Sequence, residues 1–343
     1  MKRQLPPLPN DHSMQAWADN IRSGDRRSLA QAITLVESSL ATDQERADAL
    51  LSLMQPYTGN SKRIGVTGIP GVGKSTFIDC FGMRLIEQGH KVAVLAIDPS
   101  SSLSGGSILG DKTRMNRLVA HNHAYVRPSP SGNIPGGVAR ATKESILLCE
   151  AAGFNIVLVE TVGVGQGETL IADLVDCFML LLMPGTGDEL QGIKRGIMEH
   201  ADLLIVHKAD GPSLPAAREA ASRLLHVARM LPHSSDEGSQ PILLCSSNPP
   251  EMGHPEICDA IDRFFEHSKA SGHLNQNRSR QEVEAFKRNV YEQWLLRMKE
   301  NIPLHQLMEQ MELEVSEGRM SSYRAARALF SQPAALFSQP AAF

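Results

Sequence analysis

The sequence predicts an α/β fold in which helices cover both faces of a mostly parallel central sheet. From residue 62 to about residue 270, short runs rich in β-branched residues alternate with helical patterns. These runs are apolar throughout, as expected of parallel strands that are buried on both faces. A third observation is the segment Gly68-Ile-Pro-Gly-Val-Gly-Lys-Ser75, which has the spacing G-x-x-x-x-G-K-[ST] between an apolar run and a helical stretch.

Seven runs are candidate strands, and helix-like sequence fills most of the gaps between them. Glycines at positions 89 and 153 are expected to end two of the helices, because glycine readily takes the left-handed conformation of a helix terminus. The candidate strands are Arg63–Thr67, Lys91–Ile97, Ala124–Arg127, Asn155–Glu160, Cys177–Met183, Leu203–His207 and Pro241–Cys245.

Different patterns precede and follow this region, so we expect four parts. Residues 1–60 predict an N-terminal helical extension, in which Thr42-x-x-Glu45 reads as a capping box that opens a second helix. Residues 61–270 form the sheet domain. Residues 271–330 are charged and amphipathic and predict a helical arm that packs on its own domain or on a second subunit. Residues 331–343 include part of a direct repeat and predict a low-complexity tail.

Composition excludes several classes of function. The net charge of the 343 residues is −4, which gives no global basic field for nucleic acid. No apolar run is long enough to span a membrane, and the N-terminus lacks the apolar core of a secretory signal, so a cytoplasmic location is expected. The five cysteines are scattered without a C-x-x-C pair, which favours buried reduced thiols over a metal site or disulfides.

The glycine-rich segment is a candidate phosphate-binding loop. Its glycines allow backbone N–H groups to curl around an anion, and the helix that follows adds a partial positive charge. Lys74 is expected to contact the β- and γ-phosphates, and the Ser75 hydroxyl is expected to ligate Mg²⁺. The chain is therefore predicted to bind a nucleoside triphosphate.

Three acidic residues are candidate Mg²⁺ ligands. Asp98 and Glu160 each end a predicted strand, and ligands of parallel sheets bind beyond the carboxyl ends of the strands. Asp111 lies in Leu109-Gly-Asp-Lys-Thr-Arg114 and is the weaker candidate. A carboxylate in such a position can instead cap the following helix.

Two further segments indicate GTP. Glu160-Thr-Val-Gly163 resembles the turn with which GTPases sense the γ-phosphate, through the N–H of Gly163. His207-Lys-Ala-Asp210 follows a predicted strand where GTPases have Asn-Lys-x-Asp. The Asp210 carboxylate can accept from guanine N1–H and N2–H₂, a donor pair that adenine lacks, while Lys208 packs over the ring. Cys245-Ser-Ser-Asn248, which includes Ser246 and Ser247, can supply N–H groups to guanine O6.

Together these residues resemble the MeaB/ArgK-type GTPases, which are associated with methylmalonyl-CoA mutase. The resemblance runs from about residue 20 to residue 270. Beyond the phosphate loop, it rests on long strings that are specific to the family: Ala96-Ile-Asp-Pro-Ser-Ser101, Gly105-Gly-Ser-Ile-Leu-Gly-Asp-Lys-Thr-Arg-Met115, Val126-Arg-Pro-Ser-Pro130, Glu160-Thr-Val-Gly-Val-Gly-Gln166 and Pro184-Gly-Thr-Gly-Asp-Glu-Leu-Gln-Gly-Ile-Lys-Arg-Gly196.

The resemblance implies a P-loop GTPase of the SIMIBI class that forms a homodimer through its C-terminal helices. It also implies slow GTP hydrolysis that gates adenosylcobalamin loading and protects an adenosylcobalamin-dependent acyl-CoA mutase. The residues expected to contact the phosphates are Gly71, Val72, Gly73, Lys74, Ser75 and Thr76. Those expected to hold Mg²⁺ are Ser75, Asp98, Asp111 and Glu160, and those expected to contact the base are Lys208, Asp210 and Ser246. We expect Lys74, Asp98 and Glu160 to be catalytic.

Some alternatives stay open. His207 replaces the usual Asn, which affects the expected nucleotide affinity, and Lys194 or Arg195 is either an arginine-finger-like cation or a solvated helix residue. Rival functions are an ATPase or kinase of amino-acid transport, a metal-insertion GTPase, and a nucleotide-binding protein without turnover. The second rival is expected to carry clustered His and Cys ligands, whereas the 12 histidines here are dispersed in the sequence.

Overall fold

The computed structural model describes residues 11–38, 40–98, 115–130, 137–161, 171–185, 195–228, 240–248, 251–300 and 302–330. The chain divides into two compact units, Met1–Gln281 and Glu282–Phe343, which are described separately. The domain boundaries predicted from the sequence stay predictions. No helix of the described residues is long and apolar enough to cross a bilayer.

The first unit contains a seven-stranded sheet with the strand order β3-β2-β4-β1-β5-β6-β7. Each pair of neighbouring strands is parallel. All seven predicted strands are present, so the predicted fold class is confirmed. Their bounds are β1 Lys62–Gly68, β2 Val92–Asp98, β3 Ala124–Pro130, β4 Ile156–Thr161, β5 Cys177–Leu182, β6 Leu203–Val206 and β7 Ile242–Leu244.

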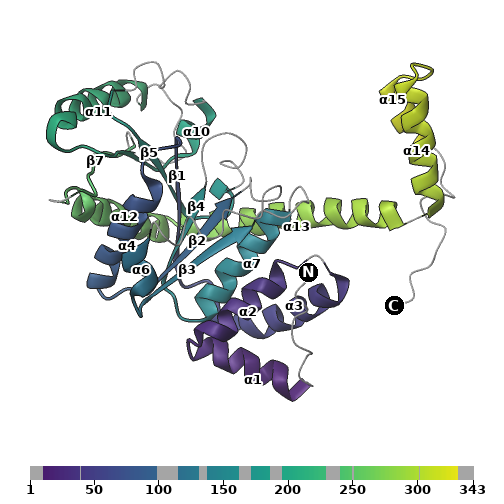
Figure 1. The fold of residues 1–343 in the computed structure, drawn as a ribbon, viewed down its shortest axis with the longest axis horizontal. Helices are drawn as coiled ribbons and strands as arrows, with labels where there is room; N and C mark the ends of the chain where they lie inside the picture. Colours follow the sequence, from purple (N-terminus) through teal and green to yellow (C-terminus); the bar gives the residue numbers. More distant parts are fainter. Residues whose placement is uncertain are drawn as a thin grey trace. The chain divides into compact units, whose positions relative to one another are not determined.

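Helices cover both faces of this sheet and enclose two hydrophobic cores (Figure 1). Side chains alternate along each strand, so Ile156 and Leu158 of β4 enter one core while Val157 and Val159 enter the other. The first core lies against α4 (Lys74–Glu87), α6 (Asn116–Ala120) and α12 (His254–Ala270). The second core lies against the helices α1 Asp11–Arg22, α2 Arg26–Val36, α3 Ala41–Met54, α7 Gly137–Ala151, α10 Arg195–His200 and α11 Leu214–Ala228.

Helix termini match the sequence in part. Gly89 and Gly153 have φ of 91° and 86° and follow α4 and α7, as predicted. The predicted capping box is wrong, because α3 begins at Ala41 and its N-cap, Leu40, makes no side-chain hydrogen bond. The side chain that caps a helix in this region is Asp25, which accepts from the backbone N–H of Ser28 at 2.7 Å and begins α2.

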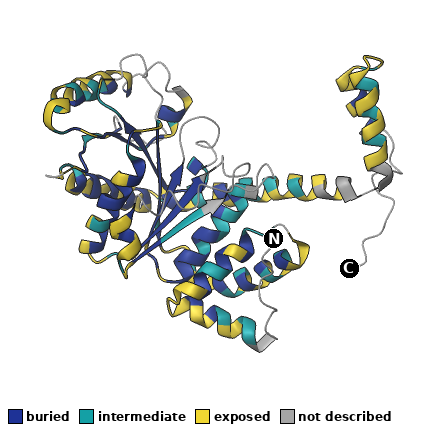
Figure 2. Ribbon diagram, viewed as in Figure 1, coloured by how far each residue is buried: buried dark blue, intermediate teal, exposed yellow. Residues whose placement is uncertain are grey.

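The C-terminal region is helical, with α13 (His273–Glu300), α14 (Ile302–Ser316) and α15 (Ser322–Phe330). The first turns of α13 belong to the first unit, where Arg278 pairs with the buried Asp176 carboxylate at 2.7 Å. In Figure 2 the central strands are almost entirely buried, whereas α14 and the later turns of α13 are largely exposed. The repeated tail lies outside the described residues.

Candidate functional site

The predicted phosphate loop connects β1 to α4 at the carboxyl edge of the sheet. Gly71 and Gly73 have φ of 79° and 95°, a conformation that side chains rarely adopt. Space also requires glycine at position 73, since a Cβ there would lie 3.0 Å from Cε1 of His207. The two glycines therefore set both the curl of the loop and its contact with the strand-β6 side of the site.

Lys74 and Ser75 begin α4, and both are buried. Lys74 Nζ donates to the carbonyl oxygens of Gly68 at 2.9 Å and Ile69 at 3.4 Å. Burial lowers the pKa of Lys74, and the nearby Glu160 carboxylate opposes that shift. Ser75 Oγ donates to Glu160 Oε1 at 3.0 Å. A cation, a hydroxyl and a carboxylate thus meet at the N-terminus of one helix.

Pairing between β1 and β4 brings Glu160 to this point. Val66 lies opposite Glu160 in the register, and one residue further the hydroxyls of Thr67 and Thr161 are 2.8 Å apart. Sequence reasoning missed this threonine pair, which lies beneath the loop and joins the two strand ends. The sequence did contain a signal for this pair. Thr67 is the last residue of one predicted apolar strand, and Thr161 directly follows another.

His207 links the candidate base-binding segment to the phosphate loop. Its Nδ1 lies 2.7 Å from the Val72 carbonyl oxygen, and its Nε2 lies 2.9 Å from Ser247 Oγ. A carbonyl can only accept, so Nδ1 carries the proton and Nε2 accepts from the hydroxyl. Burial lowers the pKa of His207, which fits this neutral form. The imidazole therefore contacts the backbone of the predicted phosphate loop.

Lys208 makes a second link of the same kind. Its Nζ donates to the Gly71 carbonyl oxygen at 2.8 Å, and its φ of 59° is the single positive value at a non-glycine residue in the described part of the chain. Because a trans peptide directs C=O and N–H to opposite sides, holding the Val72 carbonyl fixes the direction of the Gly73 N–H. The base-binding segment thus helps to set the anion-binding backbone.

Asp210 is held by the loop that follows β7. Ser246 Oγ donates to Asp210 Oδ2, and Asn248 Nδ2 donates to the same oxygen at 3.2 Å. Oδ1 meets no hydrogen-bond donor among the described residues, and the residue is only partly buried. Sequence reasoning considered Asn248 only as a source of a backbone N–H, whereas its side chain orients the carboxylate.

The structure brings together nine of the predicted site residues: Gly71, Val72, Gly73, Lys74, Ser75, Glu160, His207, Lys208 and Asp210, with Ser246 and Ser247 beside them. Thr76 lies in the first turn of α4, and Asp98 is the last residue of β2. Asp111, Gly163 and Lys194 lie outside the described residues. Arg195 begins α10.

The profile of the family described as "Methylmalonyl Co-A mutase-associated GTPase MeaB" matches residues 29–302. The chain is 44% identical over 320 residues to a probable GTPase of Mycobacterium tuberculosis, and the match covers 93% of this chain and 95% of that protein.

Two further relatives and one solved structure are similar to most of this chain. The chain is 44% identical to the GTPase ArgK of Escherichia coli, covering 93% of this chain and 96% of the relative. It is 43% identical to the methylmalonic aciduria type A homolog of Mus musculus, covering 89% and 76% of the two chains. A crystal structure named for a LAO/AO transport system kinase superposes with a TM-score of 0.75 at 38% identity, covering 95% of this chain and 99% of that one.

Replacement of His207 tests its link to the phosphate loop. His207→Ala removes hydrogen bonds to Val72 and Ser247, each worth about 1 kcal/mol, so guanine-nucleotide affinity should fall by roughly tenfold or more. His207→Asn keeps a donor and should lose less. Titration with a fluorescent GDP analogue measures both, and equal affinity of His207→Ala and the unaltered protein would contradict the link.

Proposed function

We propose a function for this chain from one premise: it belongs to the methylmalonyl-CoA mutase-associated GTPase family (MeaB) and is a GTPase. The finer proposal is that it is a GTP-hydrolysing chaperone that gates adenosylcobalamin loading and protects a cobalamin-dependent acyl-CoA mutase. The geometry that carries the nucleotide part is the direct contact of the base-binding segment with the phosphate loop, through His207 and Lys208.

The residues present fit a triphosphate with Mg²⁺. The positive φ values of Gly71 and Gly73 and the absence of room for a Cβ at Gly73 form a backbone cradle. Lys74 is buried there and donates to carbonyl oxygens of the cradle, and Ser75 faces the Glu160 carboxylate. A hydroxyl beside a carboxylate is the oxygen donor set that Mg²⁺ prefers. Bound Mg²⁺ would neutralise charge on the β- and γ-phosphates.

Each residue then has a defined role in the proposal. Lys74 binds the phosphates, Ser75 and Glu160 hold the cation, and Asp98 and Asp111 complete its surroundings. The backbone of Gly71 to Thr76 binds the phosphate oxygens, while Gly163 senses the γ-phosphate. Lys74, Asp98 and Glu160 are the proposed catalytic residues. Nothing in the described residues is placed to deprotonate the attacking water, in keeping with slow unassisted turnover.

Asp210 supports guanine over adenine. Ser246 and Asn248 both hold Oδ2, so the carboxylate is oriented with Oδ1 available to the two donors of a guanine edge. Adenine presents an acceptor where guanine N1–H donates and would leave Oδ1 without that donor. This feature favours the GTPase over an ATPase or kinase of amino-acid transport.

The proposed partner is an adenosylcobalamin-dependent acyl-CoA mutase of the methylmalonyl-CoA mutase type. Support comes from the name of the family whose profile matches the chain and from the name of the mouse relative. GTP hydrolysis would then serve as a timer for a conformation that the mutase senses. The cytoplasmic location expected from the sequence stays a prediction.

We also propose that the chain forms a homodimer through α13. In the second unit this helix carries large apolar residues at exposed positions, among them Phe286 at 66%, Tyr291 at 67% and Trp294 at 42%. Val283, Phe286, Val290 and Trp294 follow helical spacing of three and four residues and so lie along one stripe. A stripe of this size on a charged helix is suited to a second copy of the same helix.

Replacement of Asp210 tests the base assignment. Asp210→Asn loses a charged acceptor for two guanine donors, so GTP affinity should fall by about 100-fold. Xanthine carries an oxygen in place of the guanine amino group, so xanthosine triphosphate should bind the variant better than GTP does. Competition against a fluorescent nucleotide measures both. If ATP binds the unaltered protein as tightly as GTP, the guanine assignment fails.

Phosphate release from GTP tests the partner. Addition of purified methylmalonyl-CoA mutase should raise the turnover number by on the order of tenfold or more, because docking completes a site that is slow by itself. Lys74→Ala should abolish release with and without the mutase. If the mutase does not stimulate phosphate release and does not co-elute with this protein on size exclusion, the proposed partnership is contradicted.

Analytical ultracentrifugation tests the dimer. Phe286→Glu places a charge in the apolar stripe of α13 and should convert the protein to a monomer at micromolar concentration. Asn289→Glu adds the same charge on α13 outside the stripe and should leave the dimer intact. A monomeric unaltered protein, or equal effects of the two variants, would refute this interface.

A further inference from the structure

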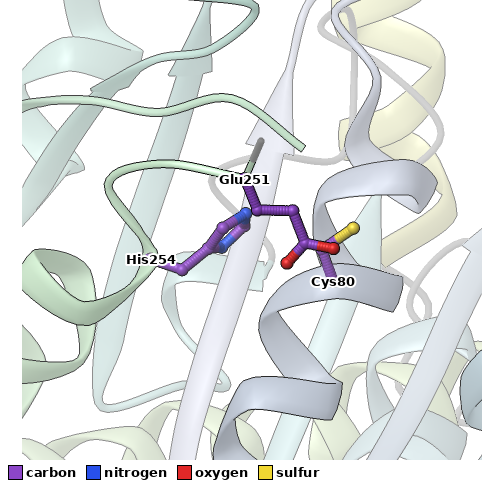
Figure 3. Close-up of side chains that lie close together, drawn as sticks. All are labelled: Cys80, Glu251 and His254. Atoms are coloured by element: carbon purple, nitrogen blue, oxygen red, sulfur yellow. The ribbon is translucent and has the colours of Figure 1, made fainter. Parts of the chain in front are cut away.

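A cluster of thiol, imidazole and carboxylate groups lies between α4 and the start of α12. Cys80 belongs to the second turn of α4, while Glu251 and His254 lie just before and at the start of α12. Figure 3 shows these three side chains converging, and one ligand atom from each lies within 4.8 Å of the others. Cys245, which follows β7, places its Sγ 3.6 Å from His254 Nε2.

The fold holds this cluster in place. The ring of His254 stacks on Phe77 and Phe81 of α4, with centroids 5.6 Å and 6.5 Å away. Gly253 has φ of 84°, and a Cβ there would lie 2.0 Å from the Leu244 carbonyl oxygen. Only glycine therefore allows the chain to return so closely to β7. That return sets His254 beside Cys245.

Most of the side chains in and beside this cluster are buried. Cys80, Cys245 and His254 are at most 6% exposed, whereas Glu251 is exposed to solvent. The nucleotide site described above uses none of the four. The sequence favoured inert buried thiols, and the five cysteines are indeed buried and free. Cys80, however, lies in a cluster with an imidazole and a carboxylate, and Cys245 contacts the same imidazole, which inert thiols do not require.

We propose that Cys80, Glu251 and His254 bind one d-block divalent cation of the Zn²⁺ or Co²⁺ type. One sulfur, one imidazole nitrogen and one carboxylate oxygen form a donor set that such cations prefer and that Mg²⁺ does not. One ligand atom from each of the three side chains already lies within 4.8 Å of the others. A fourth position of a tetrahedral site would then remain open to solvent.

The Arg117 guanidinium group contacts two of the proposed ligands. Its Nη1 donates to Glu251 Oε1 at 2.8 Å and lies 3.6 Å from Cys80 Sγ. The Arg117 side chain is 45% exposed, so it can move into solvent when a cation replaces its positive charge. Arg117 therefore competes with the cation for the same two ligands.

The cation would also affect the nucleotide, a consequence that rests on the proposed guanine site. Cys245 and Glu251 flank the loop that holds Asp210, and residues Ser246 and Met252 pair across its base. Ligands from α4 and from the C-terminal side of this segment would fix it to the phosphate-loop helix, so release of guanine nucleotide should slow.

Titration of the reduced full-length protein with Co²⁺ tests the site, because cobalt bound to thiolate gives a near-ultraviolet charge-transfer band and tetrahedral cobalt gives strong visible bands. We expect about one Co²⁺ per chain, displaced by Zn²⁺. Cys80→Ser should remove most of the charge-transfer band, and His254→Gln should weaken binding by more than tenfold. Cys258→Ser is the matched control, since this buried cysteine of α12 lies outside the cluster.

Arg117→Ala keeps the test decisive if core variants fold poorly. Its exposed side chain can be removed without disturbing the core, and loss of the competing charge should tighten Co²⁺ binding several-fold. Absence of a sulfur-to-cobalt band in the unaltered protein, or equal loss of the band in Cys80→Ser and Cys258→Ser, would overturn the site. An unchanged rate of GDP-analogue release with bound Zn²⁺ would overturn the coupling alone.

Discussion

The central strands β1, β4, β5 and β6 are buried on both faces, and this constraint determines where the chemistry of the protein can lie. Side chains within β1, β4, β5 and β6 enter one of two apolar cores, which leaves no place for a polar site along the strands. Charged and hydroxyl groups are therefore confined to the strand ends. Parallel pairing then brings the carboxyl ends of β1, β4, β6 and β7 to one edge, where the phosphate loop, Glu160 and the base-binding segments meet.

Backbone carbonyl groups connect the two halves of the candidate nucleotide site. His207 and Lys208 hold the carbonyl oxygens of Val72 and Gly71, so the segment proposed to read the base also orients the loop proposed to bind the phosphates. Lys208 adopts a left-handed backbone to do so, a conformation that costs energy and is typical of functional sites. The imidazole in place of an amide is accommodated because position 73 has no side chain.

Helix α4 serves both sites proposed for this GTPase. Its first residues, Lys74 and Ser75, are the proposed phosphate and Mg²⁺ ligands, and Cys80 faces the cluster with Glu251 and His254. Ser246 and Asn248, which hold Asp210, come from the segment that follows Cys245 and precedes Glu251 in the chain. A cation at the cluster and a nucleotide at the phosphate loop would therefore act on the same short segment, and any coupling between them must be reciprocal.

The sequence by itself determined the seven strands, the phosphate loop and most of the residues of the candidate site, because these depend on local periodicity and fixed spacing. The capping box predicted at Thr42 was wrong. A capping side chain must stand at the N-cap position and accept from a free backbone N–H, and in α3 the N-cap residue is Leu40. Only the tertiary structure decided the strand order, the contact of His207 with Val72 and the meeting of Cys80 with His254. These residues are far apart in the chain, and no local pattern encodes which strand end or helix face will lie beside another.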